Sequence, residues 1–204
     1  MNMFVSRFVL ALLVAVLYAC SDSDSSSGAE IGANVLVDSR DSRTYRTIEI
    51  GGRVWMAENL NYQGQNDISL ADDSLRMWSG CYNDSALYCE KQGRLYQWDA
   101  AMTACPEGWI LPSKADFDCL IDAVGGFDKA SDSLISLGFI ADLQGGYYFM
   151  GYFCYFDEYA YFWMRDEVRN LNARSVVFAN GSSGVSYDET YEPFALSVRC
   201  VRNR

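Results

Sequence analysis

TYRTIEIGGRVWM, residues 44–56, has the sequence pattern of a β-hairpin. Polar and apolar side chains alternate over residues 45–50, as they do along a strand that buries one face. Gly51 and Gly52 can supply the positive φ angles of a two-residue turn, and a second short strand returns over residues 53–56. We therefore expect the folded part of the chain to begin at this hairpin.

Two short helices are predicted further along the chain. The first begins at Asp99 and ends before Pro106 and Gly108, which break helices. The second begins at Ser113, which forms the pattern of a capping box with Asp116, and apolar residues then follow at helical spacing. Both helices are expected to be amphipathic.

The composition indicates one globular domain. The chain has 204 residues, of which 50% are apolar and 15% aromatic, enough for a substantial core. The formal net charge of -11 disfavours phosphate backbones, so nucleic acid is excluded as a partner. The chain has no histidine, which removes the commonest general base and the imidazole ligand of most zinc sites. We expect no enzyme activity and no cofactor.

The N-terminus has the layout of a bacterial lipoprotein signal. A basic residue, Arg7, precedes an apolar run over residues 8–17, which is too short for a membrane-spanning helix of about 20 residues. The run ends in LYAC, a tetrapeptide that resembles a lipobox and would make Cys20 an acylated first residue. Residues 1–19 are then a signal peptide. The alternative is an ordinary secretory signal with an incidental cysteine.

Residues 20–43 are predicted to be a flexible tether. The Ser/Asp-rich stretch over residues 21–28 has no apolar side chain to stabilise an ordered structure. Its start also resembles the acidic signal that exports some lipoproteins to the outer face of the outer membrane. We expect an outer-membrane protein facing the cell exterior and held to the membrane only through its lipid.

Cysteine usage points to disulfides. Excluding the cysteine at the lipobox, six remain: Cys81, Cys89, Cys105, Cys119, Cys154 and Cys200. An even number in an exported chain favours disulfides over free thiols, although six cysteines allow fifteen pairings. A short polar loop separates Cys81 from Cys89, so these two are predicted partners. The absence of any C-x-x-C pair and of histidine argues against a metal site.

Eleven of the seventeen residues from Tyr147 to Trp163 are aromatic. One interpretation is that these rings fill the core of a sheet. The other is that the alternate side chains, those that face away from the core, form a surface on which sugar rings or another protein can stack. The candidate ligand-binding residues are Tyr148, Tyr152, Phe156, Tyr159, Tyr161 and Trp163.

Motifs spread from residue 45 to residue 202 share a family pattern. They are WMAENLNY (55–62), CYND (81–84), GRLYQWDAAM (93–102), CPEGWILPS (105–113) and SVRCVR (197–202). Together they resemble the Fibrobacter succinogenes major paralogous domain, a family of secreted and lipid-anchored bacterial surface proteins. The resemblance places one such domain over residues 44–204.

The resemblance also implies a fold. The family is similar to C-type-lectin-like and sulfatase-modifying proteins, so we expect an α+β domain in which two short helices flank small twisted antiparallel sheets, stapled by disulfides. The same likeness implies a bridge between Cys105 and Cys200. With those two joined, Cys119, which lies off the apolar stripe of its helix, is left to pair with Cys154.

Three function classes stay open. The aromatic stretch and the implied lectin-like scaffold favour a non-enzymatic surface module that binds polysaccharide or a surface protein. The alternatives are a structural protein of the cell envelope and an enzyme of unknown type. A calcium site of the lectin Glu-Pro-Asn kind is disfavoured because Phe194 follows Glu192-Pro193, and the acidic pairs Asp72-Asp73 and Asp157-Glu158 are more typical of solvated surface.

Overall fold

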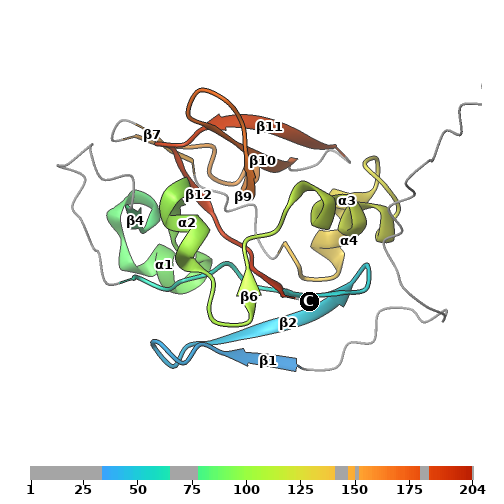
Figure 1. The fold of residues 1–204 in the computed structure, drawn as a ribbon, viewed down its shortest axis with the longest axis horizontal. Coiled ribbons are helices and arrows are strands. Elements are labelled where there is room, and N and C mark those ends of the chain that lie inside the picture. The colour runs from blue at the N-terminus through green and yellow to red at the C-terminus, as the bar shows by residue number, and fades with distance from the viewer. Residues whose placement is uncertain (1–33, 65–77, 141–146, 150–151, 180–183, 204) are drawn as a thin grey trace, which may run out of the picture.

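The computed structural model describes residues 34–64, 78–140, 147–149, 152–179 and 184–203. The predicted signal peptide and Cys20 lie outside these residues. The described chain forms an α+β domain with two sheets, and in Figure 1 helices lie between the sheets, with α1 and α2 toward one side and α3 and α4 toward the other. The predicted mixed class is therefore confirmed.

The smaller sheet has five strands in the order β1-β2-β3-β13-β6. These are β1 (Asn34–Val37), β2 (Thr44–Ile50), β3 (Arg53–Met56), β6 (Trp109–Ile110) and β13 (Val201–Arg202). The C-terminal strand β13 pairs antiparallel with β3, so the two ends of the described domain share one sheet (Figure 1).

The larger sheet has the path β11-β10-β9-β12-β5-β4, and the β7–β8 hairpin joins it through β12. Its strands are β4 (Ser79–Gly80), β5 (Leu95–Gln97), β7 (Tyr147–Phe149), β8 (Tyr152–Cys154), β9 (Tyr159–Glu167), β10 (Asn172–Ala179), β11 (Val185–Tyr191) and β12 (Ala195–Ser197). The helical segments are η1 (Tyr82–Asp84), α1 (Ala86–Gln92), α2 (Trp98–Ala104), α3 (Lys114–Ala123) and α4 (Ala130–Ser136).

The predicted hairpin is present as β2 and β3. Gly51 and Gly52 both have positive φ, 61° and 69°, as a tight two-residue turn requires. Ordered structure nevertheless starts earlier than predicted, because β1 pairs antiparallel with β2 inside the stretch assigned to the tether. Its residues Val35 and Val37 are apolar but exposed, so no buried alternation marks this strand in the sequence.

Both predicted helices are present. In α3 the Ser113 side chain accepts a hydrogen bond from the backbone of Asp116, and the Asp116 carboxylate accepts one from the backbone of Ser113, which is the predicted capping box. Phe117, Leu120 and Ile121 are fully buried on the inner face. α2 begins at Trp98, next to the predicted start, and ends before Pro106.

Two hydrophobic core clusters meet at β9. Ala160, Phe162 and Met164 belong to the first cluster, which also holds α3 and α4, whereas Tyr161 and Trp163 pack in the second, which holds α2. Successive side chains of a strand point to opposite faces. β9 is therefore covered on both faces around Phe162, Trp163 and Met164, whereas Tyr159 and Tyr161 near its start stay half-buried.

Two predicted disulfides are present. Cys81 is bonded to Cys89 across 8 residues, and Cys105 is bonded to Cys200 across 95 residues. The longer bridge ties the end of α2 to the segment that leads into β13, and Cys200 is fully buried in the second core cluster.

The predicted pairing of Cys119 with Cys154 is wrong. Cys154 is a partly exposed free thiol at the end of β8, whereas Cys119 is disulfide-bonded. The two lie in different parts of the fold, because the Cys119 carbonyl packs against the turn at Gly51 and Cys154 pairs with Tyr147 of β7 (Figure 1). The prediction paired the two cysteines that were left over, but the number of cysteines does not say which of them lie close enough in the fold to bond.

Gly93, directly after α1, should tolerate no side chain. It has φ 76° and ψ -174°, a region essentially restricted to glycine, and a Cβ there would lie 2.7 Å from Asn59 Cβ and 2.8 Å from the Leu60 carbonyl oxygen. We expect Gly93→Ala to lower the free energy of unfolding by about 2–4 kcal/mol. The matched control is Gly108→Ala, because Gly108 has a similar φ of 78° but open space around its Cβ position.

Denaturant unfolding of the two variants checks this prediction. Gly108→Ala should cost about 1 kcal/mol, from backbone strain alone. Equal losses for the two variants would show that the contact of Gly93 with the Asn59–Leu60 backbone does not constrain the fold.

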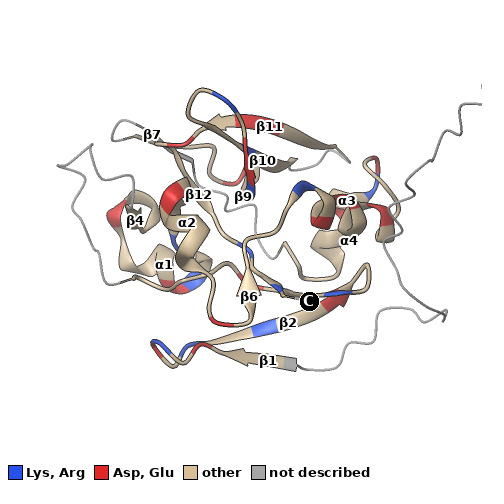
Figure 2. Cartoon of the chain, viewed as in Figure 1, with Lys and Arg blue, Asp and Glu red and all other residues tan. Residues whose placement is uncertain are grey.

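Acidic side chains are spread over the surface. Figure 2 shows Asp and Glu on α3 and on the β10–β11 ribbon, and β2 carries one basic and one acidic residue. No helix among the described residues is long and apolar enough to cross a bilayer.

Candidate functional site

Three tyrosine rings contact one another at the turn between β8 and β9, and a fourth tyrosine, Tyr152 of β8, lies three residues before Tyr155. Tyr152 is 73% exposed and Tyr155 is 46% exposed, while Tyr159 and Tyr161 are half-buried. The Tyr155 ring centroid lies 5.7 Å from that of Tyr159 and 6.1 Å from that of Tyr161, and the last two rings are 5.9 Å apart. We call Tyr152, Tyr155, Tyr159 and Tyr161 the tyrosine surface. Three of its members were predicted, and Tyr155 was not.

The turn holds these rings in place. The Tyr155 carbonyl accepts hydrogen bonds from the backbone N–H groups of Glu158, at 3.2 Å, and of Tyr159, at 3.3 Å. Tyr155 and Asp157 have positive φ, 61° and 60°, which is uncommon for residues other than glycine. Asp157 and Glu158 are exposed beside the rings, as expected for solvated carboxylates.

Phe156 lies outside the tyrosine surface, in an aromatic cluster beneath the turn. Its ring packs 4.9 Å from Tyr82 and 5.3 Å from Tyr88, and Phe153 lies 5.0 Å from Tyr82. The Cys81–Cys89 disulfide encloses Tyr82 and Tyr88 and keeps their rings in contact at 5.4 Å. Phe156 therefore packs the turn against η1 and α1 while remaining half-buried, and its role as a ligand contact stays a prediction.

Trp163 is not a surface residue. It is 0% exposed, and its indole Nε1–H donates to the Tyr96 carbonyl at 2.7 Å. The prediction failed because the second core cluster covers the face of β9 that Trp163 occupies. Tyr148 lies in β7, opposite Phe153 of β8, and its side chain is outside the described part of the structure.

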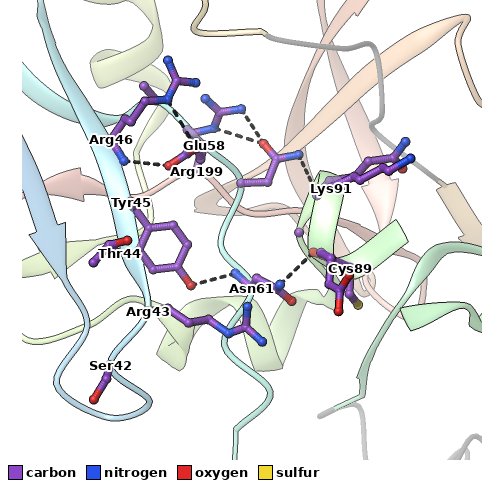
Figure 3. Close-up of a pocket in the computed structure, with 15 residues that line it drawn as sticks. Ser42, Arg43, Thr44, Tyr45, Arg46, Glu58, Asn61, Cys89, Lys91 and Arg199 are labelled. Atoms are coloured by element: carbon purple, nitrogen blue, oxygen red, sulfur yellow. Dashed lines mark hydrogen bonds and ion pairs between the residues drawn. The ribbon is translucent and has the colours of Figure 1, made fainter. Parts of the chain in front are cut away.

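A polar cavity of about 400 Å³ lies between β2 and α1, on a different part of the fold (Figure 3). β2 supplies Tyr45 and Arg46 on one side, α1 supplies Cys89 and Lys91 on the other, and the segment over residues 57–61 runs between them. This cavity was not predicted from the sequence, because its walls come from segments far apart along the chain.

Amide side chains attach the central segment to α1. Asn59 Nδ2 donates to the Gln92 carbonyl at 3.0 Å, and Asn61 Nδ2 donates to the Cys89 carbonyl at 2.7 Å (Figure 3). The last carbonyl groups of a helix have no partner within the helix, so the Asn59 amide satisfies that of Gln92. The Cys89 carbonyl also accepts from the backbone N–H of Gly93, at 3.0 Å. The Asn61 backbone N–H in turn donates to the Tyr45 hydroxyl at 3.1 Å. Burial raises the pKa of Tyr45 to about 12, so the phenol stays neutral.

Arg199 closes one end of the cavity. Its guanidinium is almost fully buried and donates to Asn59 Oδ1 and to the carbonyls of Met56 and Phe139. It also lies over the ring of Phe162, with its Cζ 5.3 Å from the ring centroid. Burial lowers its pKa to about 9, with Glu58 acting in the opposite direction, so it is largely protonated at neutral pH.

The cavity carries an excess of positive charge. Four cationic side chains and two carboxylates line it: Arg43, Arg46, Lys91, Arg199, Glu58 and Glu90. The Arg46 Nε–Glu58 Oε1 distance is 3.3 Å, and Arg43 pairs with Asp41 at 3.3 Å. Within the described part of the chain, Lys91 and Arg199 form no ion pair. The site therefore differs in sign from the strongly acidic chain around it.

The described residues contain no cluster of metal-ligating side chains. No group of three or more His, Cys, Asp and Glu side chains in this part of the chain could hold a metal ion. Glu192 is only 3% exposed, so it does not project into a calcium-binding loop, and Asp72-Asp73 lies outside the described residues. Both the tyrosine surface and the charged cavity are suited to binding.

Comparison with known proteins identifies the family. The family model described as Fibrobacter succinogenes major domain matches residues 48–202. No curated protein and no solved structure matches the chain. The match covers helices α1 to α4, the two bridges described above and every residue of the tyrosine surface. The chain therefore belongs to the Fibrobacter succinogenes major domain family.

Proposed function

We propose that this protein is a non-enzymatic module that binds neutral polysaccharide at the tyrosine surface. The observation that carries the proposal is the 46% exposure of Tyr155 in contact with the rings of Tyr159 and Tyr161, together with the 73% exposure of Tyr152 three residues earlier. Exposed aromatic rings that gather in one place mark an interaction site more often than chance exposure does. Tyrosine combines an apolar ring face, on which a sugar can stack, with a hydroxyl that hydrogen-bonds.

Charge favours a neutral polymer over an anionic one. The chain has a formal net charge of -11, and Asp157 and Glu158 are exposed in the turn that carries Tyr155. A polyanion would meet repulsion there, whereas an uncharged glycan would not. The proposal includes no catalysis and no metal.

The proposal also includes a cellular location and a fold type. The lipobox-like sequence at Cys20 supports a lipid anchor, and the Ser/Asp-rich start supports display on the outer face of the outer membrane. We also propose a C-type-lectin-like arrangement. Its support is the pairing of β13 with β3 at the two ends of the domain, together with the bridge between Cys105 and Cys200.

Affinity electrophoresis tests the proposal. The purified protein would run in native gels that contain hydroxyethyl cellulose, xylan or galactomannan, with chelator present. We expect retardation by at least one polymer. We expect Tyr152→Ala combined with Tyr155→Ala to weaken apparent affinity about tenfold, which corresponds to a loss of about 1.4 kcal/mol for the two rings together.

The control is Tyr191→Ala. Tyr191 is 40% exposed, comparable with Tyr155, but it pairs with Asn172 at one end of β10, whereas Tyr159 pairs with Ala179 at the other end. Its loss should leave retardation unchanged. Absence of retardation on every glycan would contradict the proposal and favour a structural role. Equal effects of the double variant and of Tyr191→Ala would show that binding does not take place at the tyrosine surface.

A further inference from the structure

We propose that the cavity between β2 and α1 binds the carboxylate and hydroxyl groups of a uronic acid sugar. This site is separate from the tyrosine surface and does not depend on it. Its volume of about 400 Å³ lies within the range of small-molecule sites, about 300–1,000 Å³. Charged and amide side chains dominate its lining, so a ligand that fits must itself be polar.

The cations of the cavity select an anion. Lys91 and Arg199 have no carboxylate partner among the described residues, although four of the five Arg199 N–H groups are occupied by neutral acceptors. A buried charge without a counter-ion is costly, and a bound anion would offset that cost. Lys91 lies on the exposed rim, where its ammonium can meet the ligand first.

The amides of the cavity select a hydrogen-bond donor. Asn61 is only 7% exposed, and its Oδ1 has no hydrogen-bond partner, because the Nδ2 group points at the Cys89 carbonyl. Gln92, which also lines the cavity, has a buried Oε1 without a partner. Unpaired buried acceptors are rare in folded proteins and call for a donor.

These two requirements together define the ligand class. A carboxylate satisfies the excess cations, and hydroxyl groups can donate to the two unpaired amide oxygens, which are buried and become accessible when the Asn61 and Gln92 side chains rotate toward the cavity. Inorganic phosphate or acetate offers the charge without a set of hydroxyl donors, and a neutral hexose offers the donors without the charge. A hexuronic acid carries both, either free or as a unit of a polysaccharide.

Isothermal titration calorimetry on the purified protein at low ionic strength tests the site. The probes are galacturonate, galactose, phosphate and a short oligogalacturonide. We expect galacturonate to bind and galactose to show no heat. If the oligogalacturonide binds more tightly than galacturonate, the natural ligand is the polymer. If the two bind equally tightly, the natural ligand is the free sugar or the terminal unit of a chain.

Two charge-neutralising variants should act in opposite directions. Lys91→Gln removes the rim cation and should weaken galacturonate binding about fivefold, the size expected for one partly exposed ion pair. Glu58→Gln removes the carboxylate that competes for Arg46, keeps an oxygen for the Arg46 backbone N–H, and should strengthen binding about threefold. Lys129→Gln, an exposed lysine outside the cavity, is the charge-matched control and should change nothing.

Neither Lys91→Gln nor Glu58→Gln changes the buried Arg199, so both variants are expected to fold. Galactose binding as tightly as galacturonate, phosphate binding at least as tightly as galacturonate, or affinities unchanged in both Lys91→Gln and Glu58→Gln would overturn it. Thermal unfolding of each variant would establish that the fold is retained before the affinities are compared.

Discussion

Replacing both Cys105 and Cys200 by alanine should lower the free energy of unfolding by about 4–5 kcal/mol. The bridge closes a loop with a sequence separation of 95, and closing a long loop removes much of the conformational freedom of the unfolded chain. Natural domains are stable by only about 5–15 kcal/mol, so this loss is a large part of the total. Removing both cysteines avoids leaving a lone thiol in the core.

The short bridge is the control for this prediction. Cys81 and Cys89 are separated by 8 residues, so replacing both by alanine should cost about 2.5 kcal/mol on the same loop model. Urea unfolding of the two double variants gives the comparison. A loss for the long bridge that is no larger than for the short one would show that loop closure does not account for its stabilisation.

Trp163→Ala should lower the free energy of unfolding by about 3–5 kcal/mol. The side chain is fully buried in the second core cluster, so its removal leaves a cavity and also removes a hydrogen bond to the Tyr96 carbonyl. Tyr152→Ala removes another aromatic ring from the same region of sequence, but that ring is 73% exposed. It should change stability by less than about 0.5 kcal/mol.

Urea unfolding with tryptophan-independent detection, such as far-ultraviolet circular dichroism, measures both variants. Equal and small losses would mean that Trp163 is accessible after all and would return it to the list of ligand contacts. Equal and large losses would show that Tyr152 has a packing role, which would weaken its assignment to the tyrosine surface.

Local features of this fold were predictable from the sequence. The turn at Gly51 and Gly52 and the capping box at Ser113 each depend on residues within four positions of one another, so their chemistry is readable without tertiary structure. The Cys81–Cys89 bridge belongs to the same class, because its loop is short.

Features that depend on distant segments were not predictable. Trp163 and Tyr161 are neighbours on one face of β9, yet one is buried and the other half-buried, because the layers that cover the sheet come from elsewhere in the chain. The cavity was missed for the same reason. Arg199 lies among apolar neighbours near the C-terminus, and only the fold brings it beside Glu58 and Lys91.

Tyrosine-selective NMR would test most directly the claim that the tyrosine surface binds polysaccharide. The purified protein, labelled with carbon-13 in its tyrosine rings, would be titrated with cellohexaose and with xylohexaose, and variants in which single tyrosines are replaced by phenylalanine would assign the signals. Saturable shifts of the Tyr152 and Tyr155 rings, with the Tyr191 ring unmoved, are the predicted result. Unmoved signals for Tyr152 and Tyr155, or a Tyr191 shift of equal size, would contradict the account.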